Sequence, residues 1–136
     1  MLQDRVATVT GAGRGMGEAI ARKLAERGAA VVVSDIDEAN AKHVAEEITK
    51  AGGKAIGIRT DVSDEEDAAK LAQAAVDTFG QLDIHVNNAG ISTTKLFTET
   101  TKADMERIIG VNLIGAFLCA QAAVRHMLPR NYGRII

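Results

Sequence analysis

The sequence predicts an α/β fold in which helices cover both faces of a doubly wound parallel sheet. Short runs rich in valine and isoleucine alternate with segments in which apolar residues recur at helical spacing. This alternation indicates successive strand-helix-strand units, whose right-handed crossovers produce a parallel sheet. Such sheets bind their ligands beyond the carboxyl ends of the strands. We therefore expect the functional residues to lie just after the strands.

The order of elements follows from the apolar runs and from the glycines that end the helices. The second strand, AVVVS, is almost entirely apolar, which is typical of a strand covered on both faces. The fifth strand, GRII, begins only four residues before the end of the chain. Strands are expected at residues 5–10, 30–34, 54–59, 82–86 and 133–136, and helices at residues 15–27, 38–50, 63–79 and 104–128.

Apolar spacing and local polar residues predict how the helices pack and where they begin. Met16, Ile20 and Leu24 form the expected buried stripe of the first helix. Ser63 is expected to cap the third helix, with Glu66 three residues later completing a capping box.

Composition limits the classes of function. The chain has 136 residues, the size of one domain, and a formal net charge of −2 at pH 7. This charge provides no basic field for nucleic acid or for an anionic membrane. The amino terminus has no basic head followed by a long apolar run, and no stretch approaches about 18 apolar residues. We therefore expect a cytoplasmic protein without a membrane segment.

Cysteine and histidine indicate no redox or metal chemistry. Cys119 is the single cysteine and lies in an apolar helical pattern, so we expect a small buried side chain. No metal-ligand spacing connects the three histidines, and no metal site is expected. His85 lies within the fourth predicted strand and is expected to be a hydrogen-bonded core histidine. The other two, His43 and His126, lie on predicted helices.

The segment TGAGRGMG, residues 10–17, follows the first predicted strand and opens the first helix. Glycine lets the backbone turn sharply and lets a phosphate approach closely. The amino end of a helix adds free N–H groups and a partial positive charge. We therefore expect this loop to bind the pyrophosphate of a dinucleotide, with a purely structural turn as the alternative. No Gly-Lys-Ser/Thr follows, so the loop is not the phosphate loop of a nucleoside triphosphatase.

Two acidic residues end the second and third predicted strands. Asp35 is placed to accept both hydroxyl groups of an adenosine ribose, and it would repel a 2′-phosphate. Arg14, in the glycine loop, would favour that phosphate, but the carboxylate is expected closer to the ribose, so NAD is favoured over NADP. Asp61 is a candidate acceptor for the adenine amino group. The alternatives are a solvated loop acid for Asp35 and a cap or turn acid for Asp61.

Three signatures in this order resemble the short-chain dehydrogenase/reductase family. TGAGRGMG is similar to the family's TGxxxGxG, NNAG at residues 87–90 follows the fourth predicted strand, and GVNLIGAF lies in the long fourth helix. The resemblance covers the whole chain and implies a Rossmann-like fold. It also implies an oxidoreductase that interconverts a small alcohol and a ketone by hydride transfer with a nicotinamide cofactor.

The resemblance implies roles for single residues. Asn112 is similar to the family's catalytic asparagine, which positions a water in a proton relay. Its sequence context independently predicts an amide on the inner face of an apolar helix, where it needs hydrogen-bond partners. A satisfied helix amide without a catalytic role is the alternative. The implied cofactor-binding residues are Gly11, Arg14, Gly15, Met16, Gly17, Asp35, Asp61, Val62, Asn87, Ala89 and Gly90.

The same resemblance implies that the catalytic serine and the Tyr-x-x-x-Lys pair follow the fifth strand. Tyr132 precedes that strand and has no lysine four residues later, so it is expected in a turn. We therefore expect residues 1–136 to form an incomplete NAD(P)-binding domain that is inactive alone. The helix at residues 104–128 resembles the one through which family members form homo-oligomers. A non-catalytic nucleotide-binding fragment and an assembly scaffold are the alternative functions.

Overall fold

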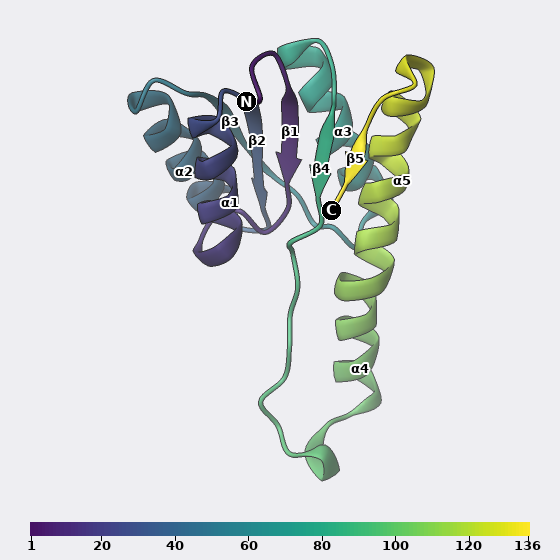
Figure 1. Cartoon of the computed structure of the whole chain (residues 1–136). Helices are drawn as coiled ribbons and strands as arrows, with labels where there is room; N and C mark the ends of the chain where they lie inside the picture. The colour runs from purple at the N-terminus through teal and green to yellow at the C-terminus, as the bar shows by residue number, and fades with distance from the viewer.

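The computed structural model describes all 136 residues as five parallel strands flanked by helices (Figure 1). The strand order is β3-β2-β1-β4-β5, so the direction of winding reverses between β1 and β4. The predicted parallel α/β fold is confirmed. The strands are β1 (Val6–Val9), β2 (Ala30–Asp35), β3 (Lys54–Arg59), β4 (Ile84–Val86) and β5 (Arg134–Ile135), and the helices are α1 (Gly15–Glu26), α2 (Glu38–Lys50), α3 (Glu65–Phe79), α4 (Lys102–Ile109) and α5 (Ala116–Met127).

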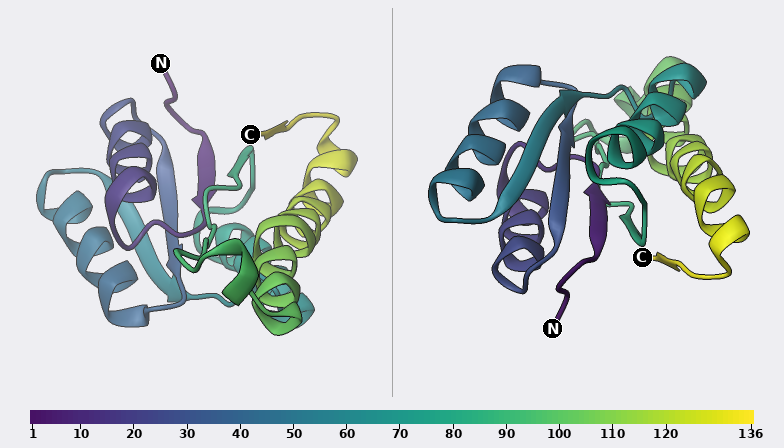
Figure 2. Two further views of the ribbon diagram at one scale, coloured as in Figure 1. Left: turned by 90° about the horizontal axis from the view of Figure 1, so that it is seen from below. Right: turned by 90° about the horizontal axis from the view of Figure 1, so that it is seen from above.

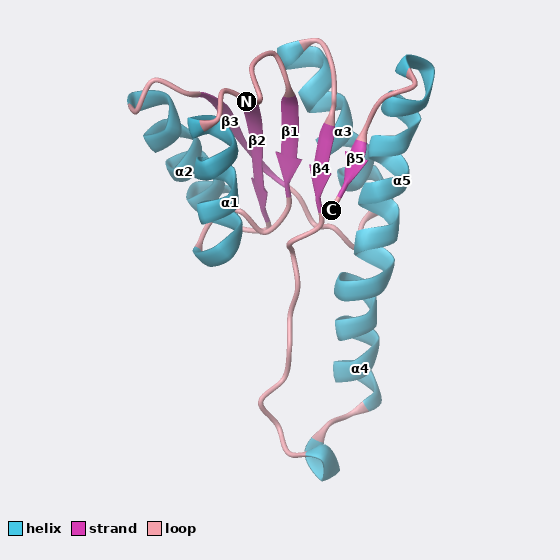
Figure 3. Ribbon diagram, in the orientation of Figure 1, coloured by secondary structure: helices cyan, strands magenta, loops and turns pink.

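Two apolar cores cover the two faces of the sheet. Helices α1 and α2 lie on one face, and α3 and α5 lie on the other (Figures 2 and 3). The interior strand β2 contributes to both, because Val31 and Val33 point into the first core and Val32 points into the second. All three are fully buried, as the apolar run predicts for a strand covered on both sides. Cys119 is also buried, and this burial raises the pKa of its thiol to about 11.

The predicted buried stripe of α1 is wrong by one position. Met16 is 78% exposed, and the buried residues of the helix are Gly17, Ala21 and Ala25. Ile20 and Leu24 lie only partly buried at the margin of the core. Gly17 faces the end of β1 at the start of the helix, where a Cβ would collide with the carbonyl oxygen of Gly11. Ala21 and Ala25 follow it on the same buried side.

The predicted cap of α3 is also wrong. Asp64 caps this helix by accepting the N–H of Asp67 at 2.9 Å, and the helix begins at the next residue. Ser63 instead donates both its N–H and its hydroxyl to Asp61 Oδ1, at 3.0 and 2.6 Å. Because Ser63 is engaged in this turn, its box with Glu66 does not form.

The long fourth helix is interrupted by one wide turn. A π-helical segment at Gly110–Gly115 joins α4 to α5, and a 3₁₀ turn at Leu128–Arg130 ends the run. The run begins at Lys102, two residues before the predicted start, because Thr101 and Asp104 form a reciprocal capping box. Single π turns inside helices are frequent at functional sites.

The whole run from Lys102 to Arg130 is long and apolar enough to cross a membrane, contrary to the expectation from the sequence. A core helix of a water-soluble protein meets the same criteria of length and composition, so this finding is weak support for a membrane segment. The amino-terminal part of the run and the loop that precedes it extend past the carboxyl ends of the strands (Figure 1).

Candidate nucleotide-binding site

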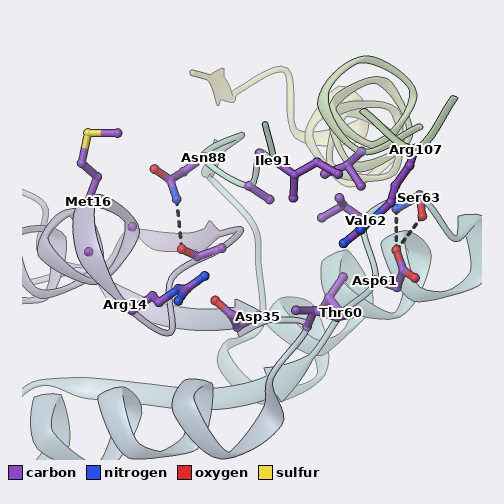
Figure 4. Close-up of a pocket in the computed structure, with 17 residues that line it drawn as sticks. Arg14, Met16, Asp35, Thr60, Asp61, Val62, Ser63, Asn88, Ile91 and Arg107 are labelled. Carbon is purple, nitrogen blue, oxygen red and sulfur yellow. Dashed lines mark hydrogen bonds between the residues drawn. The ribbon is translucent and has the colours of Figure 1, made fainter. Parts of the chain in front are cut away.

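A cavity of about 600 Å³ lies at the carboxyl ends of the strands, next to the point where the strand order reverses. It is bounded by the glycine loop, the residues after β2, β3 and β4, and one side of α4 with the π segment (Figure 4). Ten of the twelve predicted site residues line it, together with seven that sequence reasoning did not select. The lining residues are Gly11, Arg14, Gly15, Met16, Gly17, Asp35, Ile36, Thr60, Asp61, Val62, Ser63, Asn88, Ala89, Gly90, Ile91, Arg107 and Val111.

The glycine loop makes a tight turn from β1 into α1. Gly11 and Gly15 have φ values of +61° and +60°, which lie in the left-handed region that favours glycine. A Cβ on Gly17 would collide with the carbonyl oxygen of Gly11. No side chain caps the amino end of α1. Its first N–H groups are therefore free to bind an anion at the cavity wall.

Thr10 and Asn88 join the end of β1 to the segment after β4. The Thr10 hydroxyl accepts the N–H groups of Asn88 and Ala89, both at 3.0 Å. The Asn88 amide donates to the carbonyl oxygen of Thr10 at 2.9 Å, and to that of Gly11 at 3.0 Å (Figure 4). Sequence reasoning missed both residues as structural supports, although each belongs to a motif that it had identified. These bonds fix the two backbone segments that border the cavity.

Asp35 connects the end of β2 to the glycine loop. Its Oδ2 accepts the N–H of Gly13 at 2.9 Å, and its Oδ1 accepts the N–H of Asp37 at 3.0 Å. A carboxylate has about four lone-pair sites, so both oxygens keep the capacity to accept another hydrogen bond. The carboxylate is therefore oriented in the cavity and still able to bind a donor from a ligand.

Asp61 and Val62 form the opposite side of the cavity. Asp61 uses only Oδ1 within the chain, where Ser63 donates twice, and Oδ2 has no partner. It therefore acts as a turn acid and also presents a free acceptor. Val62 packs against Gly115 of the π segment, where a Cβ would lie only 2.7 Å from Val62 Cγ2. This contact sets how closely the helix approaches the cavity.

The sequence predicts Asn112 on the inner face of its helix. This prediction is wrong, because the side chain of Asn112 is exposed. Its Oδ1 accepts the N–H of Ile91 at 2.8 Å, and its Nδ2 donates to the carbonyl oxygen of Ile91 at 2.9 Å. Asn112 sits in the π segment, which turns it toward the loop after β4. The amide is satisfied by this backbone clamp, and its catalytic role stays a prediction.

Asn87 is the second predicted site residue that does not line the cavity. Its Oδ1 lies 2.9 Å from Nε2 of His85, whose Nδ1 lies 2.7 Å from the Thr8 hydroxyl. His85 is 1% exposed, and burial lowers its pKa. The neutral imidazole therefore donates from Nε2 to Asn87 and accepts at Nδ1 from Thr8. His85 is the hydrogen-bonded core histidine that the sequence predicts.

Comparison with known families gives the class of this protein. A model of the family described as short chain dehydrogenase matches residues 5–136, and the chain belongs to that family. Members of the family are oxidoreductases that bind NAD(P) and act on small alcohols or ketones.

Individual relatives have varied substrates. The chain is 46% identical to cis-4-hydroxycyclohexanecarboxylate dehydrogenase of Sinomonas cyclohexanicum, over 98% of this chain and 53% of that protein. It is 42% identical to 3-oxoacyl-[acyl-carrier-protein] reductase of Aquifex aeolicus, over 99% of this chain and 55% of that protein. It is 38% identical to a (2S)-[(R)-hydroxy(phenyl)methyl]succinyl-CoA dehydrogenase subunit of Thauera aromatica, over 99% and 54%. The chain thus spans about half the length of the curated relatives it matches.

Proposed function

We propose that residues 1–136 are the NAD-binding part of a short-chain oxidoreductase that interconverts an alcohol and a carbonyl by hydride transfer. The observation that carries this proposal is the cavity itself. It brings the glycine loop, the carboxylate of Asp35 and the carboxylate of Asp61 to one place at the switch point of the sheet. Pyrophosphate would lie at the amino end of α1, the adenosine ribose at Asp35 and the adenine near Asp61.

The preference for NAD over NADP depends on Asp35 and Arg14. Two backbone N–H groups hold the Asp35 carboxylate in place, whereas Arg14 is exposed and has no hydrogen bond or ion pair. A fixed negative charge next to the ribose disfavours a 2′-phosphate more than an exposed, unpaired cation favours it. We therefore propose NAD as the cofactor.

The chemistry divides between the cofactor and the protein. Bound NAD would supply the hydride acceptor, and the residues of this chain would bind and orient it. Tyr132 is the only tyrosine, and no Tyr-x-x-x-Lys occurs in residues 1–136. We propose that these residues alone form an incomplete domain that binds NAD without turnover. Asn112 would position a water only once the proton donor is present.

The exposed apolar face of the long helix supports the expected homo-oligomer. Met105, Ile109, Leu113 and Phe117 follow one another at four-residue spacing, and all four are exposed. Leu113 and Phe117 expose 66% and 61% of their surfaces, an arrangement that favours association with a second apolar helix. The same observation favours the second candidate function, an assembly scaffold. A cytoplasmic location remains our expectation.

Calorimetric titration of the chain with NAD and with NADP tests the proposal. We expect NAD to bind and NADP to bind more weakly, with no oxidation of simple secondary alcohols. Binding of neither dinucleotide, combined with a stable oligomer in sedimentation, would favour the scaffold instead. Turnover by the 136 residues would contradict the proposed division between binding and chemistry.

A further inference from the structure

Arg107 is a cation of the cavity that the motifs do not select. Six of the nine arginines have a hydrogen-bond or ion-pair partner for the side chain within the chain. The three without one are Arg14, Arg27 and Arg107, and two of these three line the cavity. An unpaired guanidinium at the wall of a cavity is available to a ligand, because it gives up no internal partner when the ligand binds.

The fold holds the helix that carries Arg107 at two points. Asn112 clamps the backbone of Ile91 with two hydrogen bonds, and Gly115 packs directly on Val62. Arg107 lies one helical turn before Val111, and both line the cavity from the same side of the helix. Although the Arg107 side chain is exposed, its backbone is therefore held at the cavity wall.

The surroundings of Arg107 differ from those of Arg14. Figure 4 shows Arg107 reaching past Val62 on the side of the cavity where Asp61 and Ser63 lie, whereas Arg14 lies on the other side, next to Asp35. No ion pair within 4.0 Å joins Arg107 to Asp61. The Arg107 side thus combines a planar cation, a carboxylate with a free oxygen and the apolar side chains of Val62 and Val111.

This combination fits a flat heteroaromatic ring that carries an amino group. A guanidinium stacks on the face of such a ring, valine side chains cover the rest of it, and a carboxylate accepts the amino group. A phosphate fits this side less well, because Asp61 would repel it and the uncapped end of α1 lies elsewhere in the cavity.

We propose that Arg107 stacks on the adenine ring of the dinucleotide and holds it over Val62, with the amino group directed to Asp61. The inference rests on the proposed function and adds to it a contact for the base. It makes Arg107 a determinant of affinity for the adenosine half of the cofactor. This contact does not contribute to binding of the nicotinamide half.

The test compares three variants by calorimetry with NAD and with nicotinamide mononucleotide, which lacks adenosine. We expect Arg107→Ala to weaken NAD binding about 3- to 30-fold, the range of a cation stacked on an aromatic ring. Arg107→Lys keeps the charge but loses the plane, so it should recover little of the affinity. Arg27→Ala is the matched control, because Arg27 is also unpaired but lies outside the cavity. Nicotinamide mononucleotide should bind all three variants and the unaltered chain alike.

The salt dependence separates stacking from a phosphate contact. We expect the loss in Arg107→Ala to persist when the salt concentration is raised, because a stacked ring carries no net charge. Full affinity in Arg107→Lys, or a loss that disappears at high salt, would overturn stacking and indicate a phosphate contact. Equal NAD affinities of Arg107→Ala and the unaltered chain would refute this inference alone. Failure of the unaltered chain to bind NAD would refute the proposed function and this inference together.

Discussion

The Asp35 carboxylate should decide which dinucleotide binds, and Asp35→Ala removes it. In the structure this carboxylate accepts N–H groups of Gly13 and Asp37 and faces the cavity. A hydrogen bond to a charged acceptor contributes about 1.5–3 kcal/mol, so losing the ribose contact should weaken NAD binding about 10- to 150-fold. NADP should lose less or gain, because the variant also removes a charge that repels the 2′-phosphate.

The repulsion can be estimated from Coulomb's law. Two unit charges about 5 Å apart at an effective dielectric constant of about 20 interact by about 3 kcal/mol. The phosphate carries more than one negative charge, but salt and solvent reduce the interaction, so we use about 1–2 kcal/mol for the relief. Together with the lost ribose contact, the ratio of NAD to NADP affinity should fall about 70-fold or more.

Asp35→Asn separates the two effects. The amide oxygen can still accept one N–H, so the glycine loop keeps part of its support, but the negative charge is gone. Calorimetry with both dinucleotides and a thermal melt of each variant give affinity and folding in the same samples. An unchanged NAD to NADP ratio in two folded variants would refute the assignment of Asp35 to the ribose.

Three further changes test the packing of the site and the buried histidine. Gly17→Ala places a Cβ against Gly11 O and 2.5 Å from Asn88 Nδ2, so we expect loss of NAD binding and of about 2 kcal/mol or more of unfolding free energy. Gly110→Ala is the matched control, because a Cβ at this position meets no atom within 4 Å. It should leave the melting temperature unchanged or raise it. Equal melting temperatures of the two variants would contradict this account. Asn112→Ala removes both hydrogen bonds to Ile91 and should lower the free energy of unfolding by about 1–3 kcal/mol. Hydrogen exchange at the Ile91 amide should become faster. Unchanged exchange would show that these bonds do not hold the loop. The folded-state pKa of His85 lies below its ordinary value of 6.5, so the unfolded chain binds more protons below that pH. The free energy of unfolding should therefore fall as the pH drops from about 6.5, by at most about 1.4 kcal/mol per pH unit. Urea titrations at pH 7.5 and 5.5 should show this loss, and His85→Gln should show less of it.

The strands could be predicted from the sequence because burial on both faces leaves a signal in single residues. Val31, Val32 and Val33 form one apolar run, and any parallel strand that carries it must be covered on both sides. The glycine loop and Asp35 were also predictable, because their place after a strand is fixed by the topology. In each case the local sequence and the fold require the same arrangement.

The errors occur where several local arrangements are possible and tertiary contacts select one. In TDVSDEE three residues could cap α3, and Asp64 does so because Ser63 is already bonded to Asp61. The stripe of α1 shifts because the close approach of Gly17 to Gly11 turns the small residues inward. Asn112 is exposed within the π segment, whose last residue, Gly115, packs on Val62. None of these contacts is visible in the spacing of residues along the chain.

The contacts of the cavity suggest why nucleotide binding and catalysis can be tested separately. Thr10 and Asn88 hold the two backbone segments at the switch point, Asp35 holds the glycine loop, and Asn112 holds the loop after β4. Because the groups that would contact the cofactor are already oriented by them, binding would lose little free energy to ordering the protein. A chain that binds NAD but does not transfer hydride is the outcome this arrangement predicts.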